Sequence, residues 1–173
     1  MTDEVWHPRF DVWAASAPTV LDRTWVHKHH DANVLVARVE PGDAPNTFLS
    51  ELRIPRDHAF FFEHPVDHIP GLALIEAGRQ VGVAVSHRFY DVPLDGFTFL
   101  IRELNATFSA FADLEAPVFG NSVVSDVIVK HGRTARMSYT GHYLQHGRSI
   151  GTLTGTWAIV PAGVTQRLRR ESR

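Results

Sequence analysis

The chain of 173 residues has the length of about one globular domain, and its hydrophobic fraction of 44% and charged fraction of 21% are typical of a folded protein. A domain of this size buries roughly 70% of the surface that its unfolded chain exposes, so it needs no cross-links to be stable. Because cysteine is absent, a disulfide framework and any cysteine-ligated zinc or iron–sulfur site are excluded. The net charge of −2 offers no broad basic surface for nucleic acid.

No segment approaches the roughly 18 uninterrupted apolar residues of a membrane span. The acidic beginning of the chain, MTDE, also lacks the apolar region of a signal peptide. We therefore expect one soluble, cytoplasmic domain over residues 1–173 that has no membrane or nucleic-acid partner. The 11 histidines are dense only at 27–30 and 58–68, and no HExxH motif is present, so no metal site is predicted.

The first half of the chain predicts two strands before a single long helix. Residues 1–24 are interpreted as a packed N-terminal arm, because they carry three large aromatic side chains among prolines, Trp6, Phe10 and Trp13. Apolar runs at 34–39 and 47–54 predict strands, separated by the turn sequence EPGD. The segment 70–90 opens with Pro-Gly and is apolar on nearly all sides, which predicts a buried helix.

The second half of the chain alternates between apolar and polar residues. Residues 97–110 alternate in two registers, which indicates one strand with a bulge. The segments 123–130, 135–145 and 149–160 predict three more strands, joined by two HGR turns. A helix that is apolar all round must be wrapped by the sheet, because nothing else in the chain could cover it. We therefore predict an α+β hotdog fold, an antiparallel sheet curled around one central helix, followed by a basic and frayed tail at 161–173.

Four polar side chains share one side of the predicted helix. At 3.6 residues per turn, Arg79, Gln80 and His87 fall within about 60° of Glu76. A buried carboxylate or guanidinium is costly unless it is paired or faces a wet cleft. A solvated stripe or a structural Glu–Arg pair would explain the pattern. We interpret it as a catalytic stripe, because the other sides of this helix are apolar.

A second group of polar residues, at 53–68, directly precedes the helix N-terminus. Free backbone N–H groups and the helix dipole favour anions and developing oxyanions at such a terminus. A histidine there, His64 or His68, could act as a general acid or base. Alternatively, Asp67 and His68 only cap the helix and order the loop.

The segment 64–80, HPVDHIPGLALIEAGRQ, resembles the motif of the A-factor biosynthesis hotdog family, the synthases that start γ-butyrolactone production in actinomycetes. The segments VHK at 26–28, PRDHAFF at 55–61 and SHRF at 86–89 agree with it. Hotdog dehydratases share the PGxxxxEA part. The following Arg-Gln and the RxHxFF segment make the resemblance to the A-factor family specific.

The resemblance implies an acyltransferase without an organic cofactor. It would move a β-ketoacyl group from acyl carrier protein, or coenzyme A, to the hydroxyl of a small acceptor such as dihydroxyacetone phosphate. Glu76 is then the candidate base, provided that its surroundings raise its pKa. Arg79 is the first candidate to bind the phosphate and Arg56 the second. The helix N-terminus at Gly71 and Leu72 is expected to provide donors for the thioester oxyanion.

The same resemblance adds further expectations about the site and the assembly. His64 and His68 are the candidate acid–base histidines, and His58 and Gln80 are expected to contact substrate. Well-known members of the family carry two hotdog repeats, whereas this chain has length for one. We therefore expect a homodimer in which two sheets join and each site draws on both subunits. The basic tail could alternatively dock an acidic carrier protein.

Two alternative functions stay open at this stage. A β-hydroxyacyl dehydratase or acyl thioesterase of the same fold would pair His64 or His68 with Glu76, although the loop lacks the Gly-His-Phe-Pro run of the dehydratases. A non-catalytic module that binds acyl ligands or carrier protein would keep the apolar tunnel and would not need Glu76.

Overall fold

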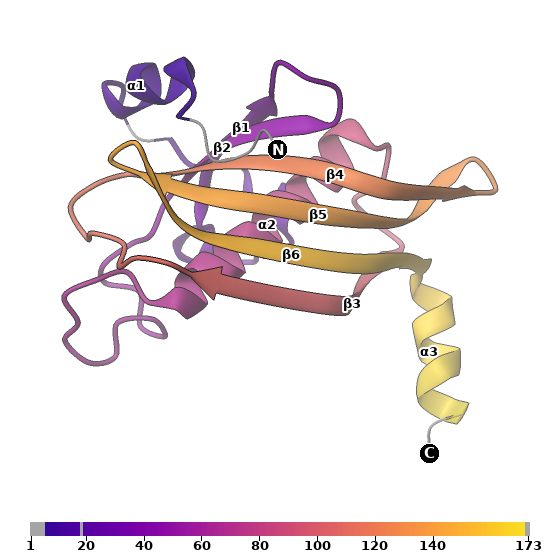
Figure 1. Cartoon of the computed structure of the whole chain (residues 1–173). Coiled ribbons are helices and arrows are strands. Elements are labelled where there is room, and N and C mark those ends of the chain that lie inside the picture. The colour runs from indigo at the N-terminus through magenta and orange to yellow at the C-terminus, as the bar shows by residue number, and fades with distance from the viewer. Residues whose placement is uncertain (1–5, 18, 172–173) are drawn as a thin grey trace.

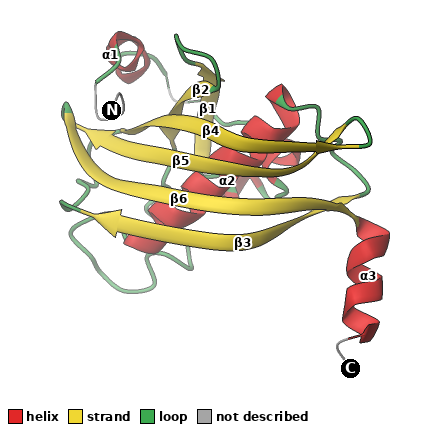
Figure 2. Cartoon of the chain, turned by 45° about the vertical axis from the view of Figure 1, so that its right-hand side comes forward, coloured by secondary structure: helices red, strands yellow, loops and turns green. Residues whose placement is uncertain are grey.

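A computed structural model describes residues 6–17 and 19–171. One sheet of six antiparallel strands, in the order β1-β2-β4-β5-β6-β3, packs against one long helix, α2 (Figures 1 and 2). The strands are β1 (Val36–Pro41), β2 (Thr47–Leu52), β3 (Phe97–Phe108), β4 (Val118–Lys130), β5 (Arg133–Gln145) and β6 (Arg148–Pro161). The helices are α1 (Pro8–Ala14), η1 (Arg23–Val26), η2 (Asp31–Asn33), α2 (Gly71–Phe89) and α3 (Ala162–Glu171). The predicted α+β hotdog fold is confirmed.

Helix α2 forms where the sequence predicts it, and it fills the main core. Ala73, Ala77, Val81 and Ala84 are buried at helical spacing against the sheet. Small residues on α2 let the strands approach closely. A methyl group at Gly78 would overlap the Tyr143 hydroxyl, which donates a hydrogen bond of 2.8 Å to the carbonyl of Leu74. The helix is therefore held to β5 by packing and by a polar contact together.

The strands after α2 form the predicted meander, although β4 begins at Val118 rather than at residue 123 and β5 at Arg133 rather than at residue 135. Before α2, β1 covers Val36–Pro41 rather than 34–39, and β2 ends at Leu52 rather than at residue 54. The two registers expected in residues 97–110 arise from an irregularity in the β3–β6 pairing between Ile101 and Glu103. Ile101 pairs with Trp157 and Leu104 with Gly155, so both apolar registers of β3 face α2.

The N-terminal arm packs on the sheet through helix α1. Phe10 and Trp13 are buried in a second cluster, separate from the α2 core, with Leu49, Phe119 and Leu144. Val118 belongs to the α2 core and Phe119 to this cluster, so α1 covers the opposite face of the sheet. Residues 1–5 and 18 of the expected arm lie outside the described residues.

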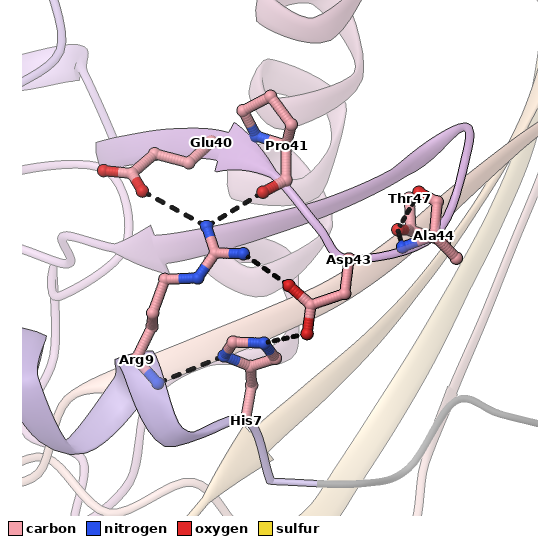
Figure 3. A network of polar contacts seen from close by, with 7 residues as sticks. All are labelled: His7, Arg9, Glu40, Pro41, Asp43, Ala44 and Thr47. Atoms are coloured by element: carbon pink, nitrogen blue, oxygen red, sulfur yellow. Dashed lines mark hydrogen bonds and ion pairs between the residues drawn. The ribbon is translucent and has the colours of Figure 1, made fainter.

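Polar contacts attach the arm to the hairpin between β1 and β2 (Figure 3). Arg9 donates to the carbonyl of Pro41 at 2.9 Å and to Asp43 at 2.9 Å. The ring of His7 lies 3.0 Å from the same Asp43 carboxylate. These contacts, on the far face of the sheet from α2, fix the orientation of the arm.

The C-terminal segment corrects one expectation. Residues 162–171 of the expected frayed tail form the helix α3, which continues from β6 and extends away from the sheet (Figure 1). Residues 172–173 of that tail lie outside the described residues. Among the described residues, none of the helices has the length and hydropathy needed to span a membrane.

Candidate active site

The carboxylate of Glu76 is held by three side chains from two parts of the chain. Arg79 donates from Nε to Oε2 at 2.7 Å and from Nη2 to Oε1 at 2.8 Å. Lys28 places its Nζ 2.7 Å from Oε1, and Gln80 donates to the same oxygen at 3.0 Å. The Glu–Arg pair, which the sequence offered as the alternative to a catalytic stripe, is present, and a cation from a distant segment joins it.

These partners decide the charge state of Glu76. Burial raises the pKa of this carboxyl, but the hydrogen bonds and charges of Arg79, with the contacts to Lys28 and Gln80, outweigh it and lower the pKa from 4.5 to about 2. The expectation that the surroundings raise the pKa is therefore wrong. Helix spacing identified Arg79 beside Glu76, but not the second cation, Lys28.

Gln80 is a structural link rather than a residue that contacts substrate, which corrects its predicted role. Its side chain is fully buried, and its Oε1 accepts the N–H of Leu35 at 2.8 Å. Its Nε2 donates to the carbonyl of Asn33 at 2.9 Å as well as to Glu76. Gln80 thereby fastens the segment 27–35, which we call the strap, to α2.

Glu76 borders a cavity of about 480 Å³, which we call the Glu76 cavity. Its lining combines the two cations with an apolar wall and consists of Lys28, Asn33, Leu35, His58, Phe60, Phe61, Leu72, Ile75, Glu76, Arg79 and Leu104. Three of the predicted site residues besides Glu76 therefore meet here, namely Arg79, His58 and Leu72. The strap, the loop 53–70, α2 and β3 all contribute to the lining.

His58 is oriented by two contacts at the edge of this cavity. Its Nε2 lies 3.1 Å from Oδ1 of Asn33, and its Nδ1 accepts the N–H of Phe60 at 3.3 Å. The ring also lies against Phe61, with centroids 4.5 Å apart. His58 is thus in contact with both the strap and its own loop.

The structure does not bring His64 or Arg56 to Glu76. Both line a separate hollow together with Phe62 and Val66. Arg56 forms an ion pair with Glu115 and donates to the carbonyl of Leu114 at 3.0 Å. Nearness in sequence to α2 therefore does not place these two side chains in the Glu76 cavity.

His68 and Gly71 also lie elsewhere than the sequence interpretation expects. The ring of His68 contacts the carboxylate of Asp67 at 2.7 Å and lies against the ring of Phe111, with centroids 4.8 Å apart and planes tilted by 53°. Gly71 begins α2 beneath the ring of Phe108, which a methyl group there would meet at 3.0 Å. Of the two N-terminal residues of α2, Leu72 is the one that lines the Glu76 cavity.

His87, the fourth member of the polar stripe, forms a separate pair near the C-terminus of α2. Its Nε2 lies 2.8 Å from Nε2 of His27, and its Nδ1 donates to the carbonyl of Val92 at 2.8 Å. Burial lowers the pKa of both histidines. Within residues 6–17 and 19–171, three His, Asp or Glu side chains nowhere gather as metal ligands would.

Sequence reasoning missed Lys28 and Asn33 as parts of this site. Lys28 lies in the VHK segment that resembles the family, but no helical or strand periodicity connects residue 28 to residue 76. Asn33 lies in a turn, η2, and has no sequence signal of its own. Both reach the site because Gln80 anchors the strap against α2.

The comparison with protein families now identifies the chain. The model of the A-factor biosynthesis hotdog domain matches residues 12–161. This chain belongs to the A-factor biosynthesis hotdog family. The matched range covers the strap, α2 and all six strands. It therefore contains every residue that lines the Glu76 cavity.

Curated relatives of this A-factor family member share part of its length. A 2-oxo-3-(phosphooxy)propyl 3-oxoalkanoate synthase of Streptomyces virginiae is 34% identical over 67 residues, which is 39% of this chain and 20% of that protein. The synthase of the same name from Streptomyces griseus is 30% identical over 100 residues, 58% of this chain and 29% of that protein. The aligned segments thus span less than a third of these relatives.

Solved structures support the fold of this A-factor family member. The AziG protein of S. sahachiroi superposes with a TM-score of 0.52 at 12% identity, over 72% of this chain and 90% of that one. A thioesterase superfamily member from Thermus thermophilus gives a TM-score of 0.51 at 15% identity, over 64% of this chain and 76% of that one. At this level of identity the likeness shows the hotdog fold alone.

The low pKa of Glu76 predicts a pH-dependent contribution to stability. Because the folded-state pKa of about 2 lies below the ordinary 4.5, the carboxylate stabilises the fold above pH 4.5, and the contribution is lost as pH falls toward 2. Glu76→Gln should therefore lower the free energy of unfolding by about 1–3 kcal/mol at pH 7, and by less at pH 3. Urea unfolding of both proteins at the two pH values measures this.

Glu115→Gln is the matched control, because Glu115 pairs with Arg56 at an exposed position. It should leave the unfolding free energy almost unchanged at both pH values. A constant difference between wild type and Glu76→Gln from pH 7 to pH 3 would contradict the depressed pKa of Glu76.

Proposed function

We propose that this chain is an acyltransferase that moves a β-ketoacyl group from a thioester of acyl carrier protein or coenzyme A to a hydroxyl of a small phosphorylated acceptor such as dihydroxyacetone phosphate. The family and the names of the relatives support this reaction. The observation that carries the proposal is the pairing of two cations with one carboxylate in the Glu76 cavity. The site keeps a net positive charge beside an apolar wall, as an anionic head and an acyl chain require.

Lys28 and Arg79 are the proposed phosphate ligands. Arginine offers a planar set of N–H donors that matches a phosphate, and lysine adds a compact charge. Glu76 holds both cations in place through contacts of 2.7 Å. In this proposal the ionised Glu76 orders the phosphate site. A carboxylate with a pKa of about 2 is a poor proton acceptor at neutral pH.

The acyl chain is proposed to lie along the apolar side of the cavity. Phe60 and Leu72 are 71% and 62% exposed, and Leu104 of β3 is 40% exposed beside them. Exposed apolar side chains that gather at a cavity mark a binding surface. The backbone N–H of Leu72, in the first turn of α2 beside this wall, is the proposed donor to the thioester oxyanion.

We also propose that a second copy of this hotdog unit pairs along β3. Strand β3 is an outer strand of the sheet, and Ile101, Leu104 and Phe108 on it are 49%, 40% and 43% exposed. An edge strand with exposed apolar side chains readily pairs with another strand. Leu104 lines the Glu76 cavity, so a partner on β3 would help to enclose the site.

The test of the reaction is mass spectrometry of the protein incubated with a β-ketoacyl thioester, with and without dihydroxyacetone phosphate. We expect a phosphorylated ester that forms only when the acceptor is present. Free β-keto acid in both samples would replace the proposal with a thioesterase. If neither sample changes, the acyl transfer proposal fails, and the protein is a dehydratase or a module that only binds acyl ligands. Incubation with a β-hydroxyacyl thioester would then reveal dehydratase activity.

The phosphate site predicts a specific effect of Lys28→Met. Loss of this cation should raise the KM for the phosphorylated acceptor about tenfold or more, because a charge-assisted hydrogen bond contributes about 1.5–3 kcal/mol. The KM for the thioester should change little. Lys130→Met, at the far tip of β4, is the control and should leave both constants unchanged. An equal rise of both KM values in Lys28→Met would contradict a phosphate role.

The pairing along β3 predicts a dimer at micromolar concentration, measured by gel filtration with light scattering. Ile101→Lys should convert the dimer to a monomer, because a charge on an edge strand opposes strand pairing. Val12→Lys on α1, at a side chain that is 67% exposed, is the matched control and should remain dimeric. A monomeric wild-type protein would refute the shared site.

A further inference from the structure

We infer that His58 is the general base of the proposed acyl transfer and that Asn33 is the residue that positions it. This inference rests on the proposed function. A hydroxyl group is a weak nucleophile until a base takes its proton, so transfer to an alcohol requires a proton acceptor within reach of the acceptor.

Among the residues that line the Glu76 cavity, His58 is the group suited to accept that proton. Glu76 is a weak base, because its pKa is about 2 and its oxygens already accept from Arg79, Lys28 and Gln80. Lysine and arginine side chains are protonated at neutral pH. The remaining lining residues are Asn33 and apolar side chains. Histidine is the side chain that gains and loses a proton near neutral pH.

The contacts of His58 define one neutral tautomer. Oδ1 of Asn33 can only accept, so the contact of 3.1 Å requires the proton on Nε2. The N–H of Phe60 donates to Nδ1, so Nδ1 carries the lone pair. At 3.3 Å this second bond is long, and Phe60 is exposed, so a substrate hydroxyl could replace it. The basic nitrogen of His58 is therefore Nδ1.

Asn33 is held rigidly enough to orient the ring. Its carbonyl accepts from the buried Nε2 of Gln80 at 2.9 Å, and its N–H donates to the carbonyl of His30 at 3.0 Å. The side-chain oxygen is thus fixed by a backbone that two other contacts anchor. When His58 takes a proton, the bond from Nε2–H to Asn33 becomes charge-assisted and stabilises the imidazolium.

The reaction step is balanced by one proton that His58 receives and returns. The acceptor hydroxyl gives its proton to Nδ1 as its oxygen attacks the thioester carbonyl carbon. The tetrahedral intermediate then collapses, the C–S bond breaks, and the leaving thiolate takes the proton from Nδ1. The products are the ester and the free thiol, and His58 is neutral again.

His58→Gln tests the catalytic role, because glutamine can still donate to Asn33 but has no basic nitrogen. We expect kcat to fall about 10²–10⁴-fold, with little change in KM. His29→Gln, an exposed position on the strap, is the control and should retain the wild-type kcat.

Asn33 is tested by a titration that requires no turnover. Asn33→Asp keeps the acceptor oxygen and adds a negative charge, so the NMR titration midpoint of the His58 ring should rise by about one pH unit or more. Asn33→Ala removes the acceptor and should not produce that rise. The His58 signal is identified by its loss in His58→Gln. An unchanged midpoint in Asn33→Asp would refute the positioning role.

The outcomes separate this inference from the proposed function. If the wild type forms the ester and the kcat of His58→Gln lies within about threefold of the wild-type kcat, the role of His58 is overturned. The proposed transferase function is then unaffected. A wild type that forms no ester would overturn the proposed function and the catalytic role of His58 together. The titration would then still decide whether Asn33 holds the ring.

Discussion

The rest of the structure depends on one constraint, the packing of a largely apolar helix, α2, against one curved sheet. Helix α2 buries small and aliphatic side chains over most of its length, so the pair of charged residues in its first half is confined to the side that the sheet leaves uncovered. Glu76 and Arg79 lie there, partly exposed. Gln80 is tolerated in the interior because each of its polar atoms has a hydrogen-bond partner.

The same constraint explains why a carboxylate near the core stays ionised. A lone buried carboxylate would take up a proton, but Glu76 receives a guanidinium from its own helix and an ammonium from the strap. The resulting cluster joins two segments far apart in sequence and leaves one cation in excess. In the proposed function this excess positive charge binds the phosphate, and the ionised Glu76 is a poor proton acceptor at neutral pH.

The proposed chemistry is therefore divided among the chain segments around the cavity. Lys28 on the strap and Arg79 on α2 provide charge, the loop 53–70 provides His58, and β3 provides an apolar wall. In the proposed dimer, the strand that pairs with the outer strand β3 helps to enclose the site.

The sequence by itself determined the fold class, the helix at 70–90, the meander, the bulge in β3 and the Glu76–Arg79 pair. These features depend on periodicity within one element, which neighbouring residues set directly. Tertiary structure alone decided that Lys28 and Asn33 join the site and that Arg56, His64 and His68 do not, because the path of a loop depends on contacts with distant residues such as Glu115 and Gln80. It also decided the charge state of Glu76. The balance between burial and its ionic partners exists only once the strap is packed against α2.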